Sequence, residues 1–246
     1  MDKSSSQSTN LTGMDFKQKA LSTAILISAA GMVPIALAAN PAPDHPKYSS
    51  ILREALSQQF DRGNLDLVSK YIESQEAVPV KQVKGSAYAL YLAQSIDRNQ
   101  KKFVNLAQAA DTNPRDRFYA LKTFASLLHT VQDFYNKTDY ISEAIKAKSS
   151  KRGTHAIDPY QLDIADWEKI KNKSVQYESA DIAIIVPDGA KISRELSLRE
   201  TQRQWEILEA LIKQRYPDRS SNILTAIKSA STPYDTREPD DFGLID

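Results

Sequence analysis

The chain has 246 residues, of which 41% are hydrophobic and 26% are charged, and its formal net charge is +1. This length suits one sizeable domain, and the near balance of charge gives no electrostatic case for nucleic acid as a partner. The seven glycines are few, which favours helices over a turn-rich sheet protein, and the lack of cysteine excludes disulfides, thiolate zinc sites and cysteine nucleophiles.

Residues 1–39 combine a polar lead with a segment typical of a secretory signal peptide. Two lysines precede an apolar run, 20–38, which carries no charge and ends in the small residues of a cleavage site near Ala38 or Ala39. An uncleaved anchor helix is the alternative, because about 19 apolar residues can just span a bilayer. In either case we expect the rest of the chain to be exported, to the periplasm or to the extracellular space.

A proline-rich linker, 40–47, leads into a helical domain that we expect to span 48–230. Apolar residues recur at helical spacing from Ile51 to Phe60, and a second, short helix is predicted from Leu65 to Ile72. A long helix is predicted from Ser86 to Ala110. The first part of the domain is therefore expected to consist of helices alone.

A further long helix is predicted to begin at Asn113, because an asparagine cap followed by Pro114 at the first helical position is a common opening. Its apolar stripe continues to about Tyr135. An irregular insertion follows near 149–190, in which the apolar run Ile182–Val186 is expected to be a buried extended segment. Together these features predict an all-α multi-helix bundle.

The last predicted helix begins at Ser193, which we expect to cap it, and ends before Pro217. Its inward face is predicted to hold Leu198, Thr201, Trp205, Leu208, Leu211 and Ile212. The remaining residues, 231–246, contain proline and are acidic, so we expect a flexible acidic tail.

The segment LLHTVQDFYNKTDY, from Leu127 to Tyr140, holds the candidate functional residues. At about 100° per residue, His129 and Asp133 share one flank of their helix and lie one turn apart. An imidazole and a carboxylate at this spacing can converge on one metal ion, or they can form a modest surface ion pair. The spacing alone leaves both interpretations open.

This segment resembles the motif of the fungal heterokaryon-incompatibility C proteins and related von Willebrand A domain-containing proteins, which reads Leu-His-Thr-x-Gln-Asp-Phe-Tyr-Ser-His-[Ser/Thr]-Asn-[Trp/Tyr]. The motif is similar in turn to a helix of the zinc-dependent phospholipase C and single-strand nuclease group. The resemblance implies an exported all-α bundle of the phospholipase C-like type. It also implies a zinc site at His129 and Asp133. Asp139, which stands where the family has asparagine, could supply a further oxygen ligand. In an active member, His129 and Asp133 would serve the hydrolysis of a phosphodiester such as a phospholipid head group.

The chain departs from this family pattern at Lys137, which stands where the family has its second histidine. A protonated ammonium is no ligand and repels a nearby dication. The other two histidines, His45 and His155, show no ligand spacing relative to His129. Carboxylates would have to complete a zinc cluster, and the candidates are Asp97, Asp111 and Asp116.

Three hypotheses for function therefore stay open. The chain is a metal-dependent phosphodiester hydrolase, or a relative with a reduced or lost zinc site and a binding or accessory role at the envelope, or an unrelated helical protein. We expect the second, with a phospholipid or another envelope component as partner and no assigned oligomeric state. Without metal, His129, Gln132 and Asp133 are expected to form a buried hydrogen-bond cluster with the helix that begins at Ser86.

Overall fold

The computed structural model describes residues 48–75, 86–152, 158–171, 175 and 186–230. Within these ranges every element is a helix and no strand occurs, which confirms the predicted all-α class. In chain order the elements are α1 (Tyr48–Leu56), α2 (Arg62–Ser74), α3 (Ser86–Ala107), α4 (Pro114–Lys137), α5 (Tyr140–Arg152), the 3-10 helix η2 (Pro159–Gln161), α6 (Trp167–Ile170), α8 (Gly189–Arg215) and α9 (Ser220–Ser229).

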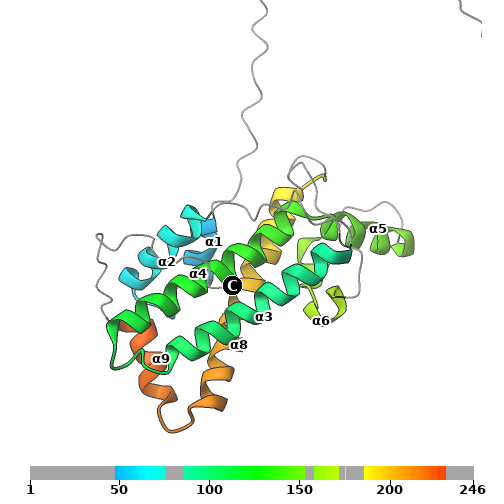
Figure 1. The fold of residues 1–246 in the computed structure, drawn as a ribbon. Coiled ribbons are helices and arrows are strands. Elements are labelled where there is room, and N and C mark those ends of the chain that lie inside the picture. Colours follow the sequence, from blue (N-terminus) through cyan, green and yellow to red (C-terminus); the bar gives the residue numbers. More distant parts are fainter. Residues whose placement is uncertain (1–47, 76–85, 153–157, 172–174, 176–185, 231–246) are drawn as a thin grey trace, which may run out of the picture. The chain divides into compact units, whose positions relative to one another are not determined.

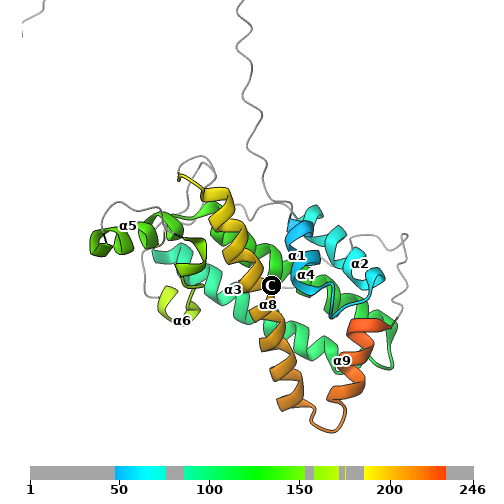
Figure 2. The ribbon, with the colours of Figure 1, turned by 180° about the vertical axis from the view of Figure 1, so that it is seen from behind.

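Helix α4 is the central element, because it packs against α2, α3 and α8. Helix α3 lies beside α4 (Figure 1), and α8 crosses the opposite side of this pair, where Figure 2 shows it in front. Helix α1 packs against α2 and α8, while α9 folds back along α8. The side chains of α4 are therefore enclosed by several helices, which places the segment from Leu127 to Tyr140 in the interior.

The first turns of α4 and α2 are each capped by a side chain that accepts a local hydrogen bond. The Asn113 side chain accepts a hydrogen bond from the Arg115 amide and Pro114 occupies the first turn of α4, which confirms the predicted opening. Helix α2 begins three residues earlier than predicted, because the Asp61 carboxylate accepts from the Asn64 amide and draws the polar triplet 62–64 into the first turn.

The start of α8 differs from the prediction. The helix begins at Gly189, directly after Asp188, whose φ of 57° is in the left-handed region. Ser193 therefore lies inside the helix, is fully buried, and donates from its hydroxyl to the Asn136 side chain. The predicted cap at Ser193 is wrong, because a buried serine that bonds across to another helix shows the same sequence signal as a capping serine.

Two apolar cores fill the bundle. In the first, Phe60, Phe103, Phe124 and Trp205 bring four separate segments together, with Phe60 and Trp205 ring centroids 4.6 Å apart. In the second, nearer to α5 and α6, the members include Tyr88, Phe134, Tyr135, Ile141, Leu162 and Ile192. The large buried aromatic surfaces are the main apolar stabilisation of the fold.

Several sequence predictions fall on residues outside the described ranges. These are the signal peptide at 1–39, the linker at 40–47, most of the run Ile182–Val186, and the tail at 231–246. They stay predictions. Among the helices that the structure describes, none is long and apolar enough to cross a membrane.

Candidate functional site

His129 and Asp133 both point into the bundle. Each side chain is only 4% exposed, and the two residues lie on the face of α4 that meets α1 and α2. A modest surface ion pair would leave both groups in water, so that interpretation of the motif is excluded by the geometry. The pair is instead a buried polar site that needs partners inside the protein.

His129 is held by the end of α2. Its Nδ1 atom lies 3.2 Å from the carbonyl oxygen of Ile72, and a carbonyl only accepts, so Nδ1 carries the hydrogen. The Nε2 atom is buried and has no hydrogen-bond partner among the described residues. Tyr48 covers the imidazole edge-on, with ring centroids 5.2 Å apart. One nitrogen is thus anchored while the other presents a lone pair to the interior.

Asp133 is held by α1. The Tyr48 hydroxyl donates to its Oδ1 atom at 3.0 Å. Burial raises the pKa of Asp133 above its usual 3.8, while the hydrogen bond from Tyr48 and the proximity of His129 and Lys137 act in the opposite direction. Burial and the neighbouring carboxylate also raise the pKa of Tyr48, so the phenol stays protonated and donates.

The polar contacts continue from Tyr48 toward α8. Asn136 forms a side-chain hydrogen bond with Tyr48, and the Ser193 hydroxyl donates to Asn136 Oδ1 at 2.5 Å. We call Tyr48, His129, Asp133, Asn136 and Ser193 the Asp133 cluster. It joins α1, α4 and α8 and touches the last turn of α2.

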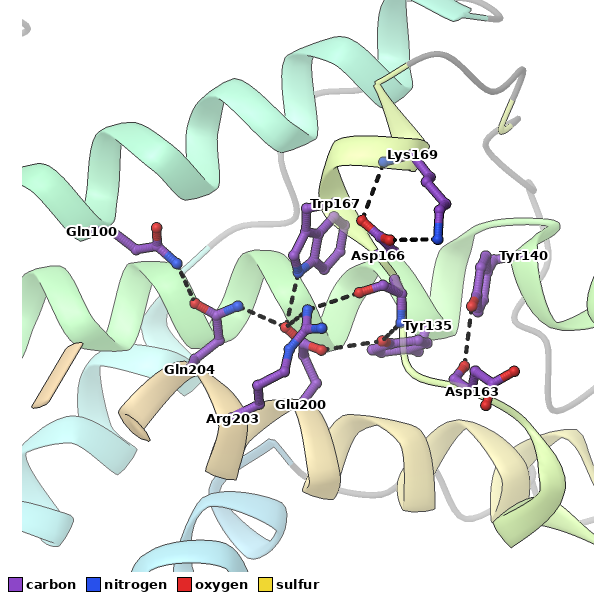
Figure 3. A network of polar contacts seen from close by, with 11 residues as sticks. Gln100, Tyr135, Tyr140, Asp163, Asp166, Trp167, Lys169, Glu200, Arg203 and Gln204 are labelled. Carbon is purple, nitrogen blue, oxygen red and sulfur yellow. Dashed lines mark hydrogen bonds and ion pairs between the residues drawn. The ribbon is translucent and has the colours of Figure 1, made fainter. Parts of the chain in front are cut away.

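A second buried carboxylate, Glu200 of α8, lies in a larger network, shown in Figure 3. Its Oε1 atom accepts from Trp167 Nε1 at 2.9 Å, from Arg203 at 3.0 Å and from Gln204 at 2.6 Å. The Tyr135 hydroxyl is 3.5 Å from Oε2, too far for more than a weak hydrogen bond. Burial raises the pKa of Glu200, and Arg203, Gln204 and Trp167 offset part of that effect.

The partners of Glu200 carry the network to three more segments. The Tyr135 hydroxyl accepts from the Ala165 amide at 2.8 Å, and Arg203 donates to the Ala165 carbonyl at 2.7 Å. Gln100 of α3 donates to Gln204 at 2.7 Å. We call Glu200, Arg203, Gln204, Trp167 and Tyr135 the Glu200 cluster. It ties α3, α4, α6 and α8 together at one point.

Sequence reasoning did not find the Glu200 cluster. The buried face of α8 carries Ser193, Ser197, Glu200, Thr201 and Gln204, whereas Leu198 and Leu211 of the predicted inward stripe are only partly buried. The signal was present as a polar series at helical spacing, but a search for apolar periodicity places such residues on the outside, and only Thr201 among them was predicted to face inward.

His129, Gln132 and Asp133 are all buried as predicted, but Gln132 does not join the other two in one cluster. Gln132 donates to Thr201 of α8 at 3.1 Å, and the other two residues bond to α2 and α1. The predicted tie to α3 is wrong. Phe124 of α4 contacts Phe103 of α3, and His129 lies five positions further along, a rotation of about 140° away from that face.

The set of zinc ligands that the resemblance implies is not brought together among the residues that the structure describes. No group of three or more His, Cys, Asp or Glu side chains forms within the described ranges, whereas zinc sites use at least three protein ligands. Asp139 lies just past the end of α4, where its carbonyl accepts from the amide of Glu143 at the start of α5. Lys137 keeps a positive charge close to Asp133.

The other carboxylates considered from sequence have local partners. Asp97 pairs with Lys101, Asp111 with Arg219, and Asp116 accepts from Asn113. They serve as surface or capping groups and do not join His129. His45 and His155 lie outside the described residues.

Comparison of the chain with protein-family models, with curated proteins and with solved structures finds no match. The likeness of the segment from Leu127 to Tyr140 to the heterokaryon-incompatibility C motif therefore rests on the motif residues alone.

Proposed function

We propose that this chain is an exported helical protein of the phospholipase C-like type that has a reduced or lost metal site and a binding or accessory role at the envelope. Support for export is the pattern of residues 1–39, and support for the type is the motif around His129. The observation that carries the proposal is the surroundings of His129 and Asp133. His129 and Asp133 stay buried, but a carbonyl and a tyrosine hydroxyl take the places next to them.

This arrangement has a physical consequence for metal binding. A dication would need both groups deprotonated and at least one further ligand, and it would have to displace Tyr48 from Asp133. Burial already favours the neutral form of the Asp133 carboxyl, and Lys137 adds repulsion toward a cation. The pair is thus better suited to holding helices together than to binding zinc.

An active metal-dependent phosphodiester hydrolase that uses His129 and Asp133 is the second candidate. One observation favours it: His129 Nε2 is buried without a partner while Nδ1 is anchored on a backbone carbonyl. That is the orientation in which ligating histidines are commonly held. Asp133 lies one turn further on and could supply an oxygen.

Metal analysis of the purified protein separates the two candidates. We expect metal far below one equivalent per chain after exchange into zinc-containing and then zinc-free buffer. We also expect no chelator-sensitive turnover of a chromogenic phosphodiester or of phospholipid vesicles. The variant His129→Ala serves as the test of the site, and Asp97→Asn, at an exposed carboxylate of α3, is the matched control.

Stoichiometric zinc that is lost in His129→Ala but kept in Asp97→Asn, together with turnover abolished by chelator, would overturn the proposal in favour of the hydrolase. Co-sedimentation with vesicles of envelope phospholipids tests the binding role separately. Failure to bind any such vesicle would remove phospholipid as the partner.

A further inference from the structure

A groove lies between the last turns of α3 and α8, is lined by residues of neither buried cluster, and has a volume of about 570 Å³. That volume is within the range of ordinary ligand sites. Its lining residues are Lys101, Val104, Asn105, Leu211, Gln214 and Arg215. The lining thus offers two cations, two amides and an apolar floor, with no carboxylate among the lining side chains.

The two cations of the groove are available to an anionic partner. Lys101 pairs with Asp97 at 2.7 Å, but both side chains are largely exposed, and such pairs are worth at most about 1 kcal/mol. Arg215 has no hydrogen-bond or ion-pair partner in the described part of the chain. Cations near helix C-termini are common because they complement the helix dipole. That effect explains the charge of Arg215, but it does not explain an adjacent groove with an apolar floor.

We propose that the groove binds the acidic segment 231–246 of this same chain. The segment carries five carboxylate side chains against a single arginine, so its charge is complementary to that of the groove. It also carries aromatic and aliphatic residues that suit the floor formed by Val104 and Leu211, namely Tyr234, Phe242, Leu244 and Ile245.

The length of the segment allows this contact. Helix α9 ends at Ser229, and Asn64 holds the Ala230 carbonyl, so the segment leaves the described fold at the end of α9. Helix α9 starts five residues after Arg215 and is about 15 Å long. Sixteen extended residues span up to roughly 50 Å, enough to return along α9 to the groove. Because both partners belong to one chain, weak contacts suffice: the effective concentration is on the order of millimolar.

The absence of native cysteine permits a direct test on the full chain. A nitroxide attached to Ile245→Cys should broaden the NMR signals of Lys101, Asn105 and Gln214 at low salt. Signals of Lys191 should not change, because this residue lies on α8 about 36 Å from Arg215. High salt should weaken the effect, since the contact is largely electrostatic.

Charge reversal supplies the decisive comparison. Lys101→Glu with Arg215→Glu should abolish the broadening, and Lys191→Glu should leave it intact. Adding Asp240→Lys and Asp241→Lys to the variant with Lys101→Glu and Arg215→Glu should restore the broadening. The proposal is overturned if the wild-type label never broadens the groove signals, or if broadening survives the groove reversal. It is equally overturned if anionic vesicles bind the groove while the label stays distant from it.

Discussion

Asp133 and Glu200 are two buried carboxylates in one bundle, and they are compensated in different ways. Glu200 receives three donors on a single oxygen, one of them a guanidinium, and these donors come from α6 and α8. Asp133 receives the hydroxyl of Tyr48 and no arginine. A carboxylate with a full set of donors fixes the positions of the helices around it. A carboxylate with one neutral donor remains a group whose charge is costly in the folded state.

The difference also separates the roles of the two clusters. The Glu200 cluster joins α3, α4, α6 and α8, so its loss would loosen several contacts at once. The Asp133 cluster joins α1 to α4 and α8 through Tyr48 and Asn136. We therefore expect substitutions at Glu200 to lower the free energy of unfolding more than substitutions around Asp133.

Glu200→Leu should give the largest effect. Removing the carboxylate leaves the amide of Gln204 and the indole N–H of Trp167 without their acceptor and takes from Arg203 its ion-pair partner, so that only the Ala165 carbonyl remains to it. Breaking a buried pair in this way costs about 3–5 kcal/mol. Urea unfolding at pH 7 measures this loss in the free energy of unfolding. Glu206→Leu, at an exposed glutamate of the same helix, is the control. Equal stabilities of the two variants would mean that the network does not hold the helices.

Tyr48→Phe should have an intermediate effect. The substitution keeps the ring against His129 but removes the hydroxyl that donates to Asp133, which leaves a buried acceptor unsatisfied at a cost of about 1–3 kcal/mol. The free energy of unfolding at pH 7 gives the value, with the exposed Tyr160→Phe as the control. If Tyr48→Phe costs the same in an Asp133→Leu background, which offers no acceptor at this position, the hydroxyl acts through some other contact.

The contrast between the clusters also shows what the sequence could reveal. The start of α4 was predictable because Asn113 and Pro114 act locally. The burial of His129 and Asp133 followed from the motif, but their partners did not, since Tyr48 and Asp133 are 85 positions apart and no periodicity relates them. Long-range pairs depend on how the helices pack, which one chain segment does not encode.

There are also physical reasons why helices α5 and α9 were not predicted from the sequence. Helix α5 is largely polar, so it lacks the apolar stripe by which a helix is recognised. Helix α9 has only ten residues and follows Pro217, which indicates only the end of the preceding helix. Glu200 escaped because its acidic side chain marks an outward position in most helices, and only its three donors make burial tolerable.

Asp133→Asn should have the smallest effect at neutral pH. The amide oxygen still accepts from Tyr48 and the costly charge is gone, so we expect a change within about 1 kcal/mol, in the stabilising direction. The substitution should instead change how the free energy of unfolding depends on pH. A carboxyl whose pKa is raised on folding binds a proton more tightly in the folded state. The contribution of Asp133 to stability is therefore greatest below the unfolded pKa near 3.8 and falls as pH rises toward the raised value.

Unfolding free energies across this pH range should thus decline less steeply in Asp133→Asn than in the wild type. A residual decline should remain, because burial raises the pKa of Glu200 in the same direction. Tyr48→Phe should steepen the decline, since the tyrosine hydrogen bond lowers the pKa of Asp133 and its loss widens the gap from the unfolded value. The decline of stability with pH is therefore expected to be least steep in Asp133→Asn, steeper in the wild type and steepest in Tyr48→Phe. A wild-type slope equal to that of Asp133→Asn would show that the Asp133 carboxyl keeps its usual pKa when the chain is folded.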